Sequence, residues 1–192
     1  MKILCVQGSP RKNGNSTTIA RRFLKIAEDR GAEIKTYRLN DLKFRPCQAC
    51  YACKTKLEHC GLKDDLTPVL KALEECDLVV VATPVYFGDI SAQTKAFIDR
   101  IFSFVKPDFH ERSDPVRFVP GKKMLWIITQ EFSEEFYSDI FPRYGGLFKE
   151  FAGFDTYLIR GTGVEEPGEV QDRPEIMAQA EEMAHNLLSQ PS

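Results

Sequence analysis

Two groups of residues in this chain have types and spacings that are suited to chemistry. In residues 8–18, hydroxyl, amide and guanidinium side chains follow directly on a short apolar run. Further along, four cysteines form the pattern Cys47-x2-Cys50-x2-Cys53-x6-Cys60. The first group is suited to binding an anion, and the second is suited to binding a metal or to thiol redox chemistry.

Residues 8–18 predict a phosphate-binding loop. They connect an apolar run at residues 3–6, which predicts a strand, to a segment with helical periodicity. The first N–H groups of a helix lack partners inside the helix, and the helix dipole favours negative charge there. The side chains that can add hydrogen-bond donors are Ser9, Arg11, Asn15, Ser16, Thr17 and Thr18.

The composition of this loop indicates which kind of phosphate it binds. It lacks the Gly-Lys-Ser/Thr ending of a nucleotide P-loop and the three-glycine spacing of a dinucleotide fingerprint. A hydroxyl-rich loop that follows the first strand and holds a single monophosphate is typical of flavodoxin-like folds. The alternative interpretation is an ordinary polar turn between a strand and a helix.

The elements that must position these residues alternate along the chain. We expect strands at residues 2–7, 33–38, 77–83, 123–129 and 155–160. They are separated by helices at 16–30, 64–75, 91–104 and 174–188 and by a broken helix at 133–152. This pattern predicts an α/β fold of the flavodoxin-like three-layer α/β/α type, with a five-stranded parallel sheet of order 2-1-3-4-5. One domain spans residues 1–192, with a Cys-rich loop at about 40–61. Asp64 and Asp65 are expected to cap a helix.

A second loop follows the central apolar strand and is suited to a planar ring. Its residues are Pro84, Val85, Tyr86, Phe87 and Gly88, which offer backbone N–H groups, two aromatic faces and a glycine that permits close approach. In a doubly wound sheet, ligands bind beyond the carboxyl ends of the strands. We therefore expect both loops to lie at one edge of the sheet. The alternative is that the aromatic side chains only cover the end of the sheet.

With these two motifs the chain resembles the NAD(P)H-dependent FMN reductase family of flavodoxin-like proteins. The matching segments are Gly8-Ser9-Pro10-Arg11, Gly14-Asn15-Ser16, Pro84-Val85-Tyr86-Phe87-Gly88 and residues 91–100. The resemblance extends over roughly residues 1–130. It implies an FMN phosphate at Ser9, Arg11, Asn15, Ser16 and Thr17, and a flavin ring against residues 84–88. Relatives have a small, Gly-rich turn after the fourth strand, whereas the bulk and charge of residues 129–132 disfavour that contact here.

The four cysteines are similar in spacing to those of iron–sulfur flavoproteins, a branch of the same family. This resemblance implies a [4Fe–4S] cluster held by Cys47, Cys50, Cys53 and Cys60. Three alternatives are open: a tetrahedral zinc site, a redox-active thiol pair, or a loop that binds no metal. Cys5 and Cys76 lie in or beside apolar strands and are expected to be packing residues.

The composition excludes several classes of function. The chain has 192 residues, of which 43% are hydrophobic, and 26 basic against 28 acidic residues give a net charge of −2. Such a chain folds to a globular core and lacks the basic field of a nucleic-acid-binding protein. It contains no apolar run of membrane-spanning length and no secretory signal, so we expect a cytoplasmic protein that binds neither membrane nor nucleic acid.

The expected function is an FMN-binding oxidoreductase that moves electrons between NAD(P)H or a redox carrier and an acceptor, through a [4Fe–4S] cluster. A ferredoxin-type carrier is an expected partner. The aromatic residues of segment 132–154 exceed what one helix buries, and they indicate a homodimer or homotetramer. The alternatives are a cluster-free NAD(P)H-dependent FMN or quinone reductase, a flavin- and thiol-based redox sensor without turnover, and a non-redox phosphosugar or nucleotide binder.

Overall fold

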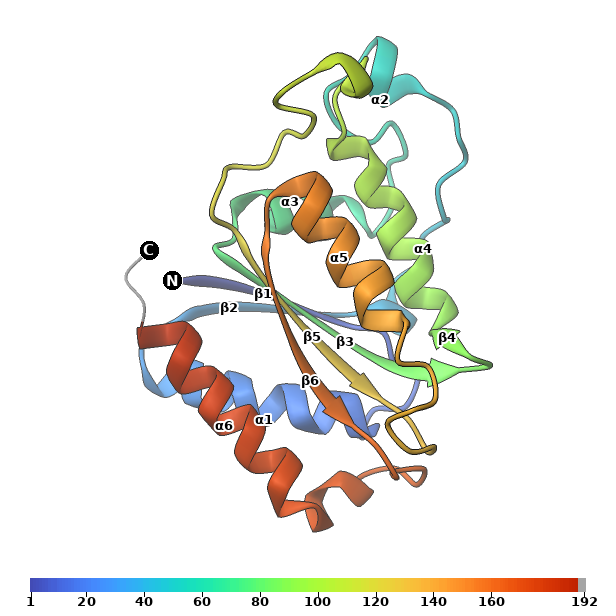
Figure 1. The fold of residues 1–192 in the computed structure, drawn as a ribbon. Coiled ribbons are helices and arrows are strands. Elements are labelled where there is room, and N and C mark those ends of the chain that lie inside the picture. Colours follow the sequence, from blue (N-terminus) through green and yellow to red (C-terminus); the bar gives the residue numbers. More distant parts are fainter. Residues whose placement is uncertain (190–192) are drawn as a thin grey trace.

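The structure is a computed structural model that describes residues 1–189, so residues 190–192 of the predicted domain lie outside the described residues. Strands and helices alternate along the chain (Figure 1). The strands are β1 (Lys2–Gln7), β2 (Glu33–Arg38), β3 (Leu78–Tyr86), β4 (Asp89–Ile90), β5 (Lys123–Thr129) and β6 (Asp155–Gly161). The helices are α1 (Asn15–Asp29), α2 (Ala52–Thr55), α3 (Thr67–Glu75), α4 (Ala92–Ile101), α5 (Ile140–Ala152) and α6 (Pro174–Ser189), with 3-10 turns at Leu39–Asp41, Phe102–Phe104, Phe109–Glu111 and Glu169–Asp172.

Five strands form a parallel sheet in the order β2-β1-β3-β5-β6. Counting only these strands along the chain, the order is 2-1-3-4-5, so the predicted flavodoxin-like topology is confirmed. The short strand β4 was not predicted. It pairs antiparallel with the end of β3 and makes a hairpin whose tip is Phe87-Gly88.

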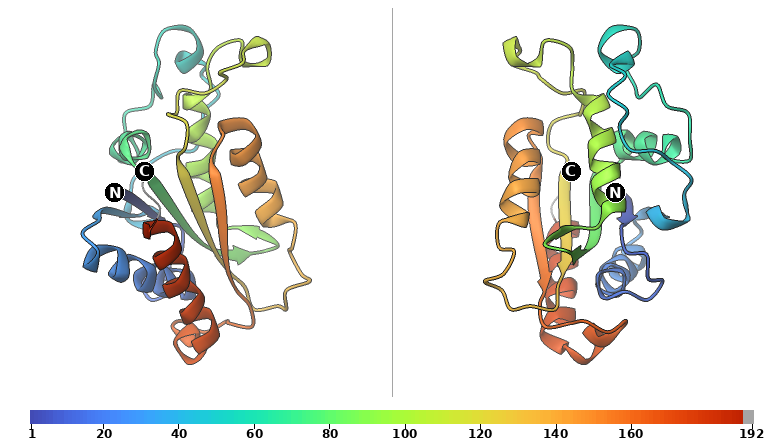
Figure 2. Two further views of the ribbon diagram at one scale, coloured as in Figure 1. Left: turned by 60° about the vertical axis from the view of Figure 1, so that its left-hand side comes forward. Right: turned by 90° about the vertical axis from the view of Figure 1, so that its right-hand side faces the viewer.

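Helices cover both faces of the sheet, as Figures 1 and 2 show. Helices α1 and α6 pack against one face, and α3, α4 and α5 pack against the other. Alternate residues of β5 supply the two cores, because successive side chains of a strand point to opposite faces. Trp126 is fully buried under α5, whereas its neighbours Leu125 and Ile127 are buried under α1 and α6.

The strand register brings the predicted loops together at one edge. Gln7 pairs with Ala82, and Pro84 pairs with Thr129, which in turn pairs with Gly161. The turns after β1, β3, β5 and β6 therefore all begin at the carboxyl edge of the sheet. The Cys-rich loop starts after the carboxyl end of β2 and runs to the opposite end of the molecule, where its helix α2 and residues 105–118 lie beyond the end of α4 (Figures 1 and 2).

Two helices begin later than predicted. The segment expected as a broken helix over residues 133–152 is helical from Ile140, because the side-chain amide of Gln130 donates to the carbonyls of Phe132, Ser133 and Phe136 and holds that stretch as a turn. Helix α3 begins at Thr67, three residues after Asp64, whose carboxylate accepts from the N–H of Leu66 and from Arg100. Within residues 1–189, no helix combines the length and apolar character needed to cross a membrane.

Candidate functional site

The loop from β1 to α1 lies in close contact with the start of α4. The backbone N–H of Gly8 donates to the carbonyl of Ala82 at 2.8 Å, and the hydroxyl of Ser91 donates to the carbonyl of Gly8 at 2.8 Å. Ser91 is also the N-cap of α4 and accepts from the N–H of Thr94. A Cβ at position 8 would lie 1.7 Å from Thr94 Oγ1. Only glycine fits there, and its close approach sets the path of the loop.

The first turn of α1 has the features of an anion site. Its N-cap is Gly14, which has no side chain to satisfy the first N–H groups of the helix. Within residues 1–189, Ser16 Oγ and Thr17 Oγ1 are fully buried and have no hydrogen-bond partner. A buried hydroxyl without a partner costs about 1–3 kcal/mol. Such atoms beside an uncapped helix start indicate that a ligand oxygen completes the site.

Asn15 and Arg11 connect this loop to the segment after β6. The amide nitrogen of Asn15 donates to the carbonyl of Glu166 at 3.0 Å, and its amide oxygen accepts from the N–H of Val170 at 3.1 Å. Arg11 lies at the surface and donates to the carbonyl of Glu165 at 2.8 Å. Asn15 therefore positions the loop, while the guanidinium of Arg11 keeps further N–H groups to offer to a ligand.

Both predicted loops line one cleft of about 160 Å³ at the carboxyl edge of the sheet. The predicted residues in its wall are Ser9, Arg11, Asn15, Pro84, Val85 and Tyr86, and the further ones are Gly14, Thr129, Gln130, Glu131, Val164 and Glu165. Phe87 and Gly88 lie outside this wall at the tip of the β3–β4 hairpin. Phe87 has a φ of 49° and is fully exposed.

Gln130, in the bulky segment after β5, turns its side chain away from solvent. It is 3% exposed, and its amide oxygen accepts two hydrogen bonds from Arg160 while its amide nitrogen donates to the turn at 132–136. These contacts fix the rim of the cleft.

The four predicted metal ligands lie around one small cavity. Cys47, Cys50, Cys53 and Cys60 all line a cavity of about 80 Å³, although Cys53 is buried and Cys47 and Cys50 are exposed. Ala49 and Tyr51 have φ values of 48° and 55°, a left-handed conformation that curls the chain between the cysteines. The four cysteines thus lie around a single pocket in the folded chain.

Two cations border this pocket. Arg100 donates to Cys60 Sγ at 3.1 Å, and Lys54 Nζ donates to the carbonyls of Phe102 and Val105 at 2.5 and 2.6 Å. Burial lowers the pKa of Lys54, and the nearby thiols of Cys53 and Cys47 act in the opposite direction. The positive charges of Arg100 and Lys54 therefore lie next to the cysteines, where they would stabilise thiolate ligands. By contrast, burial raises the pKa of Cys5 to about 12 and raises that of Cys76, as expected for packing residues.

Among residues 1–189, no three His, Cys, Asp or Glu side chains lie close enough together to bind a single metal ion.

The contacts of Asp64 predict how the stability of the protein changes in acid. Burial alone would raise its pKa, but hydrogen bonds from Arg100 and from the N–H of Arg45 outweigh burial, and the pKa lies below the ordinary 3.8. A lowered carboxyl pKa stabilises the fold above the unfolded value, and this stabilisation is lost as pH falls through the folded value. We expect the difference in melting temperature between wild type and Asp64→Asn to be largest at neutral pH and to shrink below about pH 4.

Thermal melts monitored by circular dichroism from neutral to acid pH test this expectation. The control is Asp65→Asn, since the carboxylate of Asp65 accepts from the N–H of Lys43 instead. This variant removes a carboxylate from the same turn without removing a contact to Arg100. A melting difference for Asp64→Asn that stays constant from neutral to acid pH would contradict the assignment.

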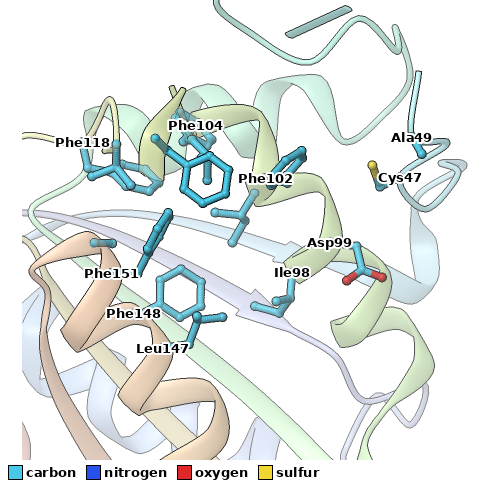
Figure 3. A pocket seen from close by; sticks show the side chains of 15 residues that line it. Cys47, Ala49, Ile98, Asp99, Phe102, Phe104, Phe118, Leu147, Phe148 and Phe151 are labelled. Atoms are coloured by element: carbon cyan, nitrogen blue, oxygen red, sulfur yellow. The ribbon is translucent and has the colours of Figure 1, made fainter. Parts of the chain in front are cut away.

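A larger apolar cavity of about 600 Å³ lies beside the Cys-rich loop (Figure 3). Phenylalanines from the end of α4 and from α5 dominate its wall, and Cys47 and Ala49 stand at one side. Its lining includes Phe102, Phe104, Phe109, Phe118, Phe148 and Phe151. Phe148 belongs to the core, but Leu147 on the same helix is 52% exposed. Of the aromatic residues in segment 132–154, Phe148 and Phe151 thus line this cavity.

Sequence reasoning missed two parts of these sites. The segment at 164–170 contributes to the cleft wall and anchors Asn15. It was missed because it lies more than 140 residues after Asn15 in the sequence. Arg100 contacts Cys60 from α4, where its neighbours Phe97 and Ile101 are buried. A charged residue on the apolar face of a helix was the available signal, because such a residue is buried only with a partner.

Comparisons with known proteins agree with this geometry. Residues 1–121 match the model of a family described as NADPH-dependent FMN reductase. The chain is 38% identical to iron-sulfur flavoproteins from Methanocaldococcus jannaschii and Methanosarcina thermophila, in each case over 100 residues that form 52% of this chain. Those residues form 51% and 52% of the two relatives, so the match spans about half the length of each.

Solved structures share the fold. An FMN-dependent NADH-azoreductase from Bacillus anthracis, in complex with FMN, aligns with a TM-score of 0.72 and 18% identity, covering 97% of this chain and 98% of that one. An NAD(P)H:quinone oxidoreductase from Methanothermobacter marburgensis aligns with a TM-score of 0.71 and 14% identity, covering 100% and 99%. Because the family model matches more than half of its length, the chain belongs to the NADPH-dependent FMN reductase family.

Proposed function

We propose that this protein binds FMN in the cleft at the carboxyl edge of the sheet and acts as an NAD(P)H-dependent oxidoreductase. The observation that carries the proposal is the pair of buried hydroxyls, Ser16 and Thr17, beside the uncapped start of α1. Together with Ser9, Arg11 and Asn15 they form the predicted phosphate site. FMN supplies the redox chemistry at its ring, accepting a hydride or single electrons.

The residues of this chain bind and orient the flavin and control access to it. The first N–H groups of α1 and the hydroxyls would donate hydrogen bonds to the phosphate, and the guanidinium of Arg11 would supply positive charge. Pro84, Val85 and Tyr86 would lie against the ring, and Gln130 would hold the rim in place from the other side. Phe87 and Gly88 belong to the proposed site as the exposed tip of the hairpin that follows Tyr86.

We also propose that Cys47, Cys50, Cys53 and Cys60 hold a [4Fe–4S] cluster. The cavity that all four thiols line and the cations beside it support the proposal. The relatives named iron-sulfur flavoproteins point the same way. A cluster carries one electron at a time and flavin carries one or two, so the pair suits exchange between NAD(P)H and a one-electron carrier of the ferredoxin type.

The proposed assembly is a homodimer or homotetramer in the cytoplasm. Exposed aromatic and aliphatic side chains at Phe132, Phe136 and Leu147 support a contact between copies of the chain. Sedimentation equilibrium of the purified protein measures the assembly directly, and a monomer at micromolar concentration would contradict this part of the proposal.

The first experiment is the visible absorption spectrum of protein purified without oxygen, with iron, sulfide and zinc assayed on the same sample. We expect flavin bands, additional broad absorption that dithionite bleaches, and about four iron atoms per chain. Cys50→Ser should abolish the iron but keep the flavin, whereas the control Cys76→Ala, which alters a buried cysteine outside the loop, should keep both.

Other outcomes select the alternatives. Flavin without iron after reconstitution would leave a cluster-free FMN or quinone reductase. Flavin that NAD(P)H does not reduce, with thiol-dependent changes in assembly, would indicate a redox sensor. A protein without affinity for flavin would contradict the whole proposal and leave a non-redox phosphate-ligand binder.

A further inference from the structure

Arg100 is a buried arginine whose hydrogen bonds all go to the Cys-rich loop and the residues at its two ends. It lies at the end of α4 and is only 1% exposed. Its Nε donates to Cys60 Sγ at 3.1 Å, and its Nη1 donates to the carbonyl of Arg45 at 2.8 Å. The Nη2 donates to the carbonyl of Leu62 at 3.4 Å. The remaining donors meet the two carboxylate oxygens of Asp64, at 2.7 and 3.1 Å.

This arrangement uses the full donor set of a guanidinium. Arginine has five N–H bonds in a rigid plane, and here five acceptors surround it. The two-pronged pair with Asp64 fixes the orientation of the plane, so that Nε faces the sulfur. Lysine could replace the charge, but it could not reproduce this geometry.

We infer that Arg100 is a positioning residue for the metal centre, holding Cys60 in the ligand set and making the centre easier to reduce. The inference rests on the proposed function, since it requires that Cys60 is a ligand. Hydrogen bonds to the sulfurs and nearby charge set the reduction potential of an iron–sulfur cluster. One-electron reduction of a bound cluster would add one negative charge, which the Nε–H dipole held at Cys60 would stabilise, while the carboxylate of Asp64 compensates the charge of the guanidinium.

Arg117 provides a matched control. It is another arginine near the same end of α4, but its guanidinium donates to the carbonyls of Ser103 and Val105 instead of to a sulfur. Replacing Arg117 therefore removes a nearby positive charge without removing an N–H···S hydrogen bond. The comparison separates the specific contact at Cys60 from the general effect of charge.

The test is a redox titration of the cluster, followed by visible absorption and electron paramagnetic resonance, in the full-length protein. The variants are Arg100→Lys, the double variant Asp64→Asn/Arg100→Met, which leaves no unpaired charge in the core, and Arg117→Met. We expect each Arg100 variant to show about a tenfold lower ratio of reduced to oxidised cluster at the wild-type midpoint, which corresponds to a shift of about −59 mV. Arg117→Met should change this ratio by no more than about twofold.

The outcomes separate this inference from the proposed function. If wild type binds no iron after reconstitution, the proposed function fails and the inference fails with it. If wild type binds the cluster but the Arg100 variants and Arg117→Met have the same midpoint, the inference alone is overturned. Loss of iron from folded Arg100→Lys protein, with iron retained by Arg117→Met, would support the positioning of Cys60. Circular dichroism establishes that each variant is folded.

Discussion

The double variant Ser16→Ala/Thr17→Val should bind FMN at least about 100-fold more weakly than wild type, because each hydroxyl bonded to a charged phosphate contributes about 1.5–3 kcal/mol. Its affinity for riboflavin, which has no phosphate, should stay close to that of wild type. The flavin-free variant should be as stable as wild type or more stable, since it no longer buries two hydroxyls that lack a partner within residues 1–189. Flavin fluorescence titrations and thermal melts measure the three quantities.

Thr18→Val is the control for this experiment. Thr18 is the next residue on α1, but its hydroxyl already donates to the carbonyl of Gly14 at 3.2 Å. Its replacement should change FMN affinity by less than about fivefold. Equal losses of FMN and riboflavin affinity in Ser16→Ala/Thr17→Val would show that the hydroxyls do not face the phosphate, and would contradict the proposed orientation of the flavin.

Gly8→Ala should destabilise the protein by about 1–3 kcal/mol or more, because the added methyl group overlaps Thr94 Oγ1. The same change should weaken FMN binding, since Gly8 sets the path of the phosphate loop against α4. Removing the overlapping hydroxyl with Thr94→Ala should recover part of the loss. A double-mutant cycle on urea unfolding measures this coupling, which should be about 0.5–3 kcal/mol for residues in contact.

Gly146→Ala is the matched control, because a Cβ at position 146 in α5 meets no atom within 4 Å. This replacement should stabilise the protein by about 0.5–1 kcal/mol, as alanine is preferred to glycine inside a helix. If Gly8→Ala does not lower the free energy of unfolding relative to Gly146→Ala, the close approach of the β1–α1 loop to α4 is contradicted.

The parts of the fold that were predicted from the sequence depend on local patterns. Apolar runs such as the one in β3 and the helical periods between them are sufficient to give the order of the parallel sheet. The position of the loop at residues 8–18 between β1 and α1 was also predictable, because its polar residues are neighbours along the chain, whereas its role in binding phosphate stays a prediction.

The missed parts depend on contacts between distant residues. Asp64 has the sequence position of a helix cap, yet its carboxylate is bound by Arg100, which lies 36 residues later. The turn before α5 follows from Gln130, whose amide satisfies three carbonyls that a helix would otherwise need to bind. In each case one polar side chain outweighs local propensity, and its partner cannot be read from neighbouring residues.

The contacts of Arg100 also affect how much conformational entropy the Cys-rich loop would lose when it binds the proposed metal centre. Because one guanidinium binds the carbonyls of Arg45 and Leu62, the chain between them is a closed ring of roughly 17 residues in the folded protein. Arg45 and Leu62 are therefore already fixed when the protein folds. Metal binding would need to order only the residues between them. We expect a preorganised loop whose cofactor can leave and return while the sheet stays folded, unlike small metal domains that unfold when the ion is removed.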